Sequence, residues 1–166
     1  MKVIIIGGAG YIGAHIVDSL CEEGHDVLVF DNLSSGFKEN LNKKCKFING
    51  DILDSSFLDK VFEQEKFDAL IHMAALKSAN KSMDNTQLYT TTNLMGSINV
   101  ISAAIKFNID KIIFSSTAAV YGNPMTDVID EKHPINPVSY YGLSKLYVEQ
   151  YLALMERVYG IKYIAL

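Results

Sequence analysis

A tyrosine and a lysine four residues apart are the pair in this chain best suited to acid–base chemistry. They lie in the segment PVSYYGLSKLYVEQ, residues 137–150, which carries Tyr140, Tyr141 and Lys145. On a helix, positions four apart lie within roughly 40° of each other, so Tyr141 shares a face with the lysine. Tyr140 points roughly 100° away from Tyr141, towards the face of Ser144.

A tyrosine hydroxyl becomes a proton acceptor only when its surroundings stabilise the phenolate. The pKa of a free phenol is about 10, and lowering it by about 3 units requires roughly 4 kcal/mol. An ammonium about 4 Å away, at an effective dielectric of about 20, supplies on the order of 4 kcal/mol. The spacing therefore predicts that Lys145 activates Tyr141 as a base.

A glycine-rich turn near the N-terminus indicates what this pair would act on. The segment VIIIGGAGYIGAH places Gly7, Gly10 and Gly13 in G-x-x-G-x-x-G spacing, after an expected strand and at the start of an expected helix. In such turns the first glycine allows a tight turn, the second lets a pyrophosphate approach the backbone, and the third lets the helix sit close to the sheet. The helix N-terminus adds free N–H groups and a positive dipole end. The pattern predicts a dinucleotide site.

An acidic residue after the second expected strand favours one dinucleotide over another. Asp31 follows Gly7 by roughly the 20 residues at which such folds place a carboxylate for the adenosine ribose hydroxyls. A carboxylate there repels a 2′-phosphate, so NAD is favoured over NADP. After the third expected strand, the segment NGDILD offers Asp51 and Ile52. These two residues either bind and cover the adenine or form a helix-capping turn.

Three hydroxyl residues end the fifth expected strand, in the segment KIIFSSTAAVYG. Ser115, Ser116 and Thr117 should lie near the nicotinamide, because ligands of doubly wound sheets bind beyond the carboxyl ends of the strands. Ser139 is a suitable N-cap for the helix that carries the Tyr–Lys pair. Beside an oxidised nicotinamide, this pair would accept the proton of a hydroxyl that loses a hydride. His72, which ends the fourth expected strand, is interpreted as structural.

The elements that must position these residues alternate along the chain. Strands are expected at 2–6, 26–30, 45–49, 68–72, 111–116 and 161–166, and helices at 11–23, 54–65, 86–107 and 139–159. The strands are continuously hydrophobic, which indicates burial on both faces. The sequence predicts an α/β fold, a Rossmann-type doubly wound parallel sheet with helices on both faces. Because the last residues, YIAL, lie inside the sixth strand, we expect one NAD-binding domain, 1–166, truncated in or near that strand.

The composition argues against several other classes of protein. The 166 residues are 49% hydrophobic and 20% charged, as in a globular domain. A net charge of -4 without a Lys/Arg run disfavours nucleic acid. Cys21 and Cys45 do not form a disulfide framework, and the four histidines lack metal-ligand spacing. The first apolar run is too short for a signal peptide, and no segment has the length of a membrane span. We expect a cytoplasmic protein with no metal and no membrane partner.

Taken together, the motifs resemble the UDP-glucose 4-epimerase family of the extended short-chain dehydrogenase/reductase superfamily. The superfamily is marked by G-x-x-G-x-x-G, a Ser/Thr and Y-x-x-x-K. The segments GGAGYIGAH, DNLSSG, HMAALKS, TTNLMGS, FSSTAAVYG and YYGLSKLYVEQ follow in family order over essentially the whole chain. The resemblance implies a Rossmann domain followed by a smaller C-terminal substrate domain, which is missing here. Ala75 replaces a common glycine and Tyr140 a frequent proline.

The resemblance also implies roles at the matching positions. Tyr141 is similar to the family's catalytic base, Lys145 to its pKa-tuning partner and ribose ligand, and Thr117 to the residue that binds the sugar 4-hydroxyl. The implied NAD contacts are Gly7, Gly10, Tyr11, Ile12, Gly13, Asp31, Asn32, Ser35, Gly36, Asp51, Ile52, Met73, Ala74, Ala75, Lys77, Asn93, Ser115, Tyr141 and Lys145. The implied reaction is epimerisation at C4 of a UDP-hexose, UDP-glucose or UDP-galactose, through a 4-keto intermediate. The implied assembly is a homodimer that pairs the helices at about 86–107 and 139–159.

Related activities stay open as alternatives. A nucleotide-sugar dehydratase would place an Asp-Glu pair after Thr117, where this chain has Ala118 and Ala119. A decarboxylase or a reductase acting on a nucleotide-sugar fits the same superfamily motifs. In its truncated form the chain would also fit a non-catalytic NAD-binding module.

Overall fold

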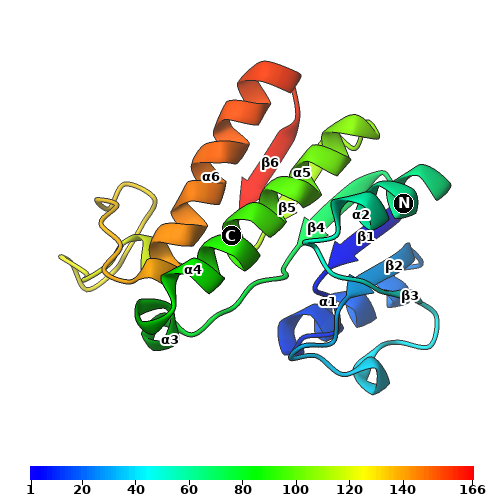
Figure 1. Ribbon diagram of the computed structural model, residues 1–166, viewed down its shortest axis with the longest axis horizontal. Helices are drawn as coiled ribbons and strands as arrows, with labels where there is room; N and C mark the ends of the chain where they lie inside the picture. The colour runs from blue at the N-terminus through cyan, green and yellow to red at the C-terminus, as the bar shows by residue number, and fades with distance from the viewer.

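The computed structural model describes all 166 residues and contains one parallel sheet of six strands in the order β3-β2-β1-β4-β5-β6 (Figure 1). The strands are β1 (Lys2–Ile6), β2 (Asp26–Asp31), β3 (Lys46–Asn49), β4 (Ala69–His72), β5 (Lys111–Phe114) and β6 (Lys162–Ala165). The chain runs outward from β1 to β3, returns to β4 and continues outward on the other side to β6. This is the doubly wound order that the sequence predicts.

Helical segments follow most of the strands. They are α1 (Tyr11–Glu22), α2 (Ser55–Gln64), α3 (Ala79–Asp84), α4 (Thr86–Tyr89), the π-helix η2 (Thr90–Met95), α5 (Gly96–Lys106) and α6 (Tyr140–Tyr159), with short 3₁₀ turns η1 (Lys38–Asn40) and η3 (Ala118–Val120). All six expected strands and the helices at 11–23, 54–65 and 139–159 are present within a few residues of their expected ends. The fifth strand ends at Phe114, so Ser115 and Ser116 follow the strand rather than close it.

Side chains that alternate along each strand pack into two hydrophobic cores on opposite faces of the sheet. On one face Ile4 and Ile6 pack in a core completed by α2, α5 and α6. On the other face Val3 and Ile5 pack with Val17 of α1. Figure 1 shows α5 and α6 side by side over the first face, where they also contact each other. The expected arrangement of helices on both faces is confirmed.

Capping residues fix where α6 begins and ends. The Ser139 hydroxyl accepts a hydrogen bond from the Gly142 amide at 3.2 Å, as an N-cap does. At the other end Gly160 has φ 72, the left-handed conformation that glycine adopts at little cost. The N-cap places Tyr140 and Tyr141 in the first turn of the helix, at the carboxyl edge of the sheet.

The prediction of one uniform helix at 86–107 is wrong. Four α-helical residues lead into a π-helix, and a regular α-helix resumes at Gly96. The wider π turn places the Asn93 side chain inward, where it is 1% exposed and bonded to another loop. The short helix α3, whose N-cap is Ser78, was not expected from the sequence. π turns of this kind occur frequently at functional sites.

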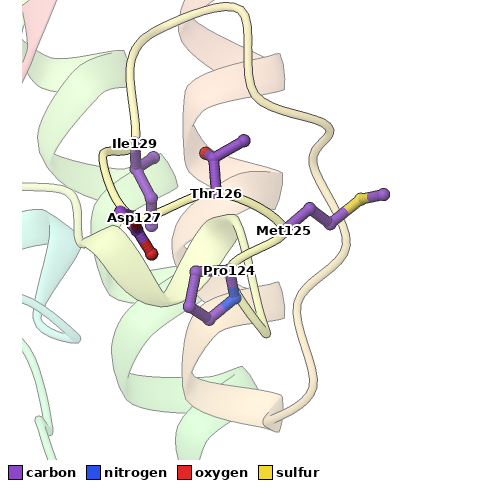
Figure 2. Close-up of a pocket in the computed structure, with 5 residues that line it drawn as sticks. All are labelled: Pro124, Met125, Thr126, Asp127 and Ile129. Atoms are coloured by element: carbon purple, nitrogen blue, oxygen red, sulfur yellow. The ribbon is translucent and has the colours of Figure 1, made fainter.

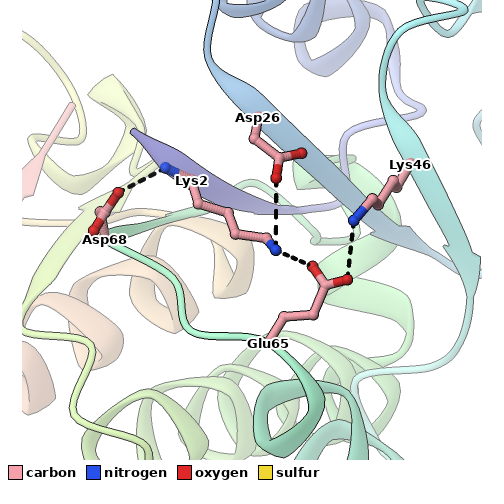
Figure 3. A network of polar contacts seen from close by, with 5 residues as sticks. All are labelled: Lys2, Asp26, Lys46, Glu65 and Asp68. Atoms are coloured by element: carbon pink, nitrogen blue, oxygen red, sulfur yellow. Dashed lines mark hydrogen bonds and ion pairs between the residues drawn. The ribbon is translucent and has the colours of Figure 1, made fainter.

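Charged residues tie the strands together at the amino edge of the sheet, opposite the edge that carries the predicted site (Figure 3). Glu65 lies between Lys2, at 2.6 Å, and Lys46, at 3.0 Å. Lys2 also contacts Asp26 at 3.5 Å, and its backbone amide donates to Asp68 at 2.7 Å. The two lysines lower the pKa of the Glu65 carboxyl.

No helix in the structure combines the length and the apolar character needed to cross a bilayer.

Candidate active site

The residues predicted to bind and react gather at the carboxyl edge of the sheet. Gly7 directly follows β1, Met73 follows β4, Ser115 follows β5, and Asp31 is the last residue of β2. Strand order reverses between β1 and β4, because the chain leaves β1 in one direction and returns to β4 on the other side. Open parallel sheets bind ligands in the crevice at this switch point.

The glycine turn after β1 is closely packed on one side and open on the other. Gly7 has φ +84, and a Cβ atom there would lie 2.4 Å from the Ala74 backbone nitrogen. A Cβ atom on Gly13 would lie 2.7 Å from the Gly7 carbonyl oxygen. At Gly10 the nearest atom would be 3.6 Å away. The turn therefore leaves Gly10 as the position where another molecule can approach the backbone.

The first turn of α1 presents amide groups that no side chain caps. Gly10 is the N-cap and makes no side-chain hydrogen bond, and Ala14 is the first residue whose amide donates back to it, at 2.9 Å. Tyr11 and Ile12 are 78% and 62% exposed. An uncapped helix start with a positive dipole end fits the pyrophosphate of a dinucleotide.

Asp31 is held in place by backbone amides beside this turn. Its two carboxylate oxygens accept hydrogen bonds from Ala9, at 2.9 Å, and from Leu33, at 2.8 Å. Each oxygen keeps a further acceptor position, so the carboxylate suits a pair of ribose hydroxyls and repels a phosphate. Next to it the side-chain amide of Asn32 donates to the Asp51 carboxylate at 3.0 Å. These residues fit an NAD-type adenosine ribose.

The loop after β4 is fastened to the glycine turn. The amides of Met73 and Ala74 both donate to the Ile6 carbonyl, at 2.8 and 3.0 Å. Met73, Ala74 and Ala75 are half-buried, and Lys77 is exposed. The loop after β2 packs on the same turn, where Gly36 is buried against Ala9 while Ser35 is exposed.

Ile52 and Asn93, both predicted to touch the cofactor, are almost completely buried. Ile52, 6% exposed, packs under Gly96 of α5, where a Cβ atom would lie 2.4 Å from its Cδ1. Asn93, 1% exposed, uses its side chain to bind the backbone of Leu76 and the hydroxyl of Ser144. Both side chains have structural roles here, and their contact with a cofactor stays a prediction.

The Tyr–Lys pair lies in the first two turns of α6. Tyr141 is half-buried, and its amide donates to the Ser82 hydroxyl of α3 at 2.9 Å. Lys145 is 3% exposed, and its ammonium donates to the Ser115 carbonyl at 2.6 Å. The ammonium also lies 4.7 Å from the ring centroid of Phe114. Burial lowers the pKa of Lys145 from 10.5 to about 8, and Glu149 opposes that change.

The hydroxyl residues after β5 surround the same part of α6. Thr117 is the N-cap of η3, and its hydroxyl accepts from the Ala119 amide at 3.2 Å. The turn η3 packs on α6 so closely that a Cβ atom on Gly142 would lie 2.6 Å from the Ala119 carbonyl oxygen. Ser116 donates to the Glu149 carboxylate on the next turns of α6. The structure thus brings the segment of Thr117 to the turn that carries Tyr141.

A hollow elsewhere on the surface contains none of the predicted site residues. It measures about 380 Å³ and lies in the loop between η3 and α6, where Figure 2 shows its lining residues Pro124, Met125, Thr126, Asp127 and Ile129. All five lining residues are exposed. The predicted site residues lie at the edge of the sheet and not in this hollow.

The polar residues beneath the site are not evident from the sequence. Ser82, Ser97 and Ser144 are buried and hydrogen-bonded to neighbouring elements. Each is a small polar residue within a helical segment and carries no motif of its own. The one sequence signal that could have identified them is a polar residue at a helical position expected to face the core.

A parallel sheet in this order, with a glycine turn at its switch point, belongs to the Rossmann class of dinucleotide-binding folds. The profile of the NAD dependent epimerase/dehydratase family matches residues 3–166. The chain belongs to this family.

Individual relatives agree with the family assignment. The UDP-glucose 4-epimerase of Lacticaseibacillus casei is 42% identical over 166 residues, which are 100% of this chain and 50% of that protein. A crystal structure of the Thermotoga maritima UDP-glucose 4-epimerase with UDP-glucose has a TM-score of 0.95 at 38% identity, covering 99% of this chain and 54% of that one. The Thermus thermophilus UDP-glucose 4-epimerase with NAD has a TM-score of 0.95 at 35% identity, with the same coverage. The chain spans about half the length of the curated relatives it matches.

Proposed function

We propose that this chain is the NAD-binding part of an enzyme that epimerises a UDP-hexose at C4. The observation that carries the proposal is the buried ammonium of Lys145, one helical turn beyond Tyr141 at the carboxyl edge of the sheet. Removing a charged group from water is energetically unfavourable. A buried titratable group in a cleft is therefore a candidate for a functional site. Family membership and the relatives named above support C4 epimerisation as the reaction.

The chain would hold the cofactor through the groups already described at the edge of the sheet. The first turn of α1 and Gly10 would bind the pyrophosphate, and Asp31 the adenosine ribose. Lys145 and Ser115 would lie at the nicotinamide end. They are bonded to each other beside β5, whereas the groups for the pyrophosphate and the adenosine ribose follow β1 and β2. The chemistry that NAD supplies when bound is the acceptance and return of a hydride.

The residues of α6 and η3 would move the proton that accompanies the hydride. Tyr141 accepts the proton of the 4-hydroxyl as the C4–H bond breaks, which leaves a 4-keto sugar, and returns it to the rotated sugar. Lys145 favours the phenolate by its charge, and Thr117 holds the 4-hydroxyl by a hydrogen bond. With the pKa of Lys145 at about 8, most of the lysine is charged at neutral pH.

The region that grips the nucleotide-sugar would lie outside residues 1–166. Relatives twice as long as this chain support this division, because the chain matches only about half of each. Residues 1–166 would then form the NAD-binding domain. We expect this segment to bind NAD and to show no measurable epimerase turnover by itself.

A homodimer is part of the proposal. Leu88 and Met95 are 47% and 48% exposed along α4 and η2, and Tyr147 and Leu154 are 41% and 47% exposed along α6. Tyr147 and Leu154 are seven residues apart in one regular α-helix, so they lie along one face of α6. Leu152, in contrast, is fully buried against the sheet of its own domain. Sedimentation of the chain, with Leu154→Lys as the disrupting variant, measures this association.

The decisive experiment joins residues 1–166 to the second half of the Lacticaseibacillus casei relative. We expect the chimera to interconvert UDP-glucose and UDP-galactose, and its Tyr141→Phe variant to lose turnover while still binding NAD. A chimera that binds NAD and UDP-hexose without interconverting them would support the non-catalytic alternative. Release of water from the sugar would support a dehydratase, although Ala118 and Ala119 stand where that chemistry needs acids.

A further inference from the structure

A row of buried polar residues runs beneath the Tyr–Lys pair and connects four elements. Its members come from β4, η2, α5 and α6, and each is 2% exposed or less: His72, Asn93, Ser97 and Ser144. Buried polar groups are stable only when they are hydrogen-bonded, so each member reports a specific contact.

The hydrogen bonds of Ser97 determine where the proton of His72 lies. The Ser97 hydroxyl donates its only proton to the Asn93 carbonyl, at 2.5 Å. It must therefore accept from the His72 Nε2 atom, which lies 2.7 Å away. His72 therefore carries a proton on Nε2, and a second proton on its buried Nδ1 atom would have no hydrogen-bond acceptor.

The Asn93 side chain continues the row to α6. Its Oδ1 atom accepts from the Leu76 amide at 2.8 Å, and its Nδ2 atom donates to the Leu76 carbonyl at 3.0 Å. The same Nδ2 atom donates to the Ser144 hydroxyl at 3.2 Å. Ser144 in turn donates to the Tyr141 carbonyl at 2.7 Å. Asn93 thus clamps the loop after β4 to the first turn of α6.

The surroundings of His72 keep it uncharged. Its ring centroid lies 5.7 Å from that of Phe114, the ring over which the Lys145 ammonium lies. Burial, with the charge of Lys145 as a second cause, lowers the pKa of His72 to about 3. A second cation at this place would oppose the lysine, whereas a neutral donor does not.

We propose that His72 is a positioning residue for the Tyr141–Lys145 pair, acting as a neutral Nε2–H donor that fixes Ser97 and thereby the π-helical turn and its Asn93 clamp. What the positioned pair does rests on the proposed function. The hydrogen bonds themselves do not depend on it.

The test measures the histidine proton and the clamp separately in the 166-residue chain. A ¹⁵N–¹H spectrum of the imidazoles should show His72 neutral with its proton on Nε2. In His72→Leu, we expect the Leu76 amide to exchange with solvent at least about tenfold faster than global stability explains, because its acceptor is no longer held. His72→Gln keeps a donor at the Nε2 position and should restore most of the protection.

A control variant separates positioning from packing. Val29→Ala removes core volume on the α1 face of the sheet, opposite the face on which His72 meets Ser97 of α5, and should change Leu76 exchange only through global stability. Ser97→Ala cuts the row with little change in volume and should reproduce the effect of His72→Leu. In the active chimera both substitutions at the row should lower kcat more than they raise KM.

Each remaining outcome contradicts the proposal. A charged His72, or one with its proton on Nδ1, would overturn it in the native chain without any variant. Leu76 exchange in His72→Leu that merely follows the Val29→Ala control would reduce His72 to packing. Failure of NAD to bind would contradict the proposed function but would not affect the exchange and imidazole measurements. The proposed function and the positioning role of His72 can therefore be refuted independently.

Discussion

Replacing Lys145 by methionine should stabilise the folded chain at neutral pH and abolish the chemistry. Methionine fills a similar volume but carries no charge. Lowering the pKa of Lys145 from 10.5 to about 8 means that folding disfavours its ammonium by roughly 3 kcal/mol. The lost hydrogen bond to the Ser115 carbonyl offsets about 2 kcal/mol of that gain. We expect a net increase of about 1 kcal/mol in the free energy of unfolding.

The effect of Lys145 on the free energy of unfolding should depend on pH. Because the folded pKa of Lys145 lies below its unfolded value, the destabilisation is fully present below about pH 8 and is relieved as the pH rises towards 10.5. Between pH 7 and about pH 9.5 this one group should raise the stability of the native chain by about 2 kcal/mol. Lys145→Met lacks this contribution.

Denaturant unfolding across that range measures the difference between the two proteins. The stability advantage of Lys145→Met should shrink with rising pH and then reverse, because the native chain is relieved of its buried charge. Lys60→Met, an exposed lysine on α2, should keep the native profile. Parallel pH profiles of native chain and Lys145→Met would refute the reasoning, because they would mean that the ammonium is not desolvated.

Three further predictions concern other parts of the chain. Asp31→Asn should weaken NAD binding about tenfold and reduce the preference over NADP, as titration of both dinucleotides would show; unchanged selectivity would remove Asp31 from the site. Glu65→Gln should cost about 1 kcal/mol at neutral pH, because it breaks pairs with Lys2 and Lys46. Since the pKa of Glu65 is lowered by folding, that stability is present above its unfolded pKa and disappears as the pH falls through the folded one, so native and variant should converge in acid. Gly13→Ala should cost about 3 kcal/mol in thermal or denaturant unfolding, because its Cβ atom meets backbone at 2.7 Å; a stability within experimental error of native would contradict the packing described.

The sheet could be predicted from the sequence because its signal is local. Strand β1 occupies residues 2–6 as expected, and its run of Val and Ile side chains is buried on both faces. The glycine turn and the spacing of Tyr141 and Lys145 are likewise patterns of neighbouring residues. Such local patterns can be read from the sequence because they determine secondary-structure elements. They do not depend on how those elements contact one another.

The row beneath the site could not be predicted in the same way. Asn93 and Ser144 are 51 residues apart, and only the packing of η2 on α6 brings them together. The π turn itself has no distinct sequence signature, so 86–107 reads as one helix. Met83 and Met95 look like core residues by type, yet they are 59% and 48% exposed because the helices that carry them turn those faces outward.

The ion pairs around Glu65 lie at the end of the strands away from Tyr141 and Lys145. Distant groups without shared partners contribute to stability additively. Surface charge at that end can therefore be redesigned to strengthen the fold, for use as a scaffold, without changing the end that carries the candidate active site.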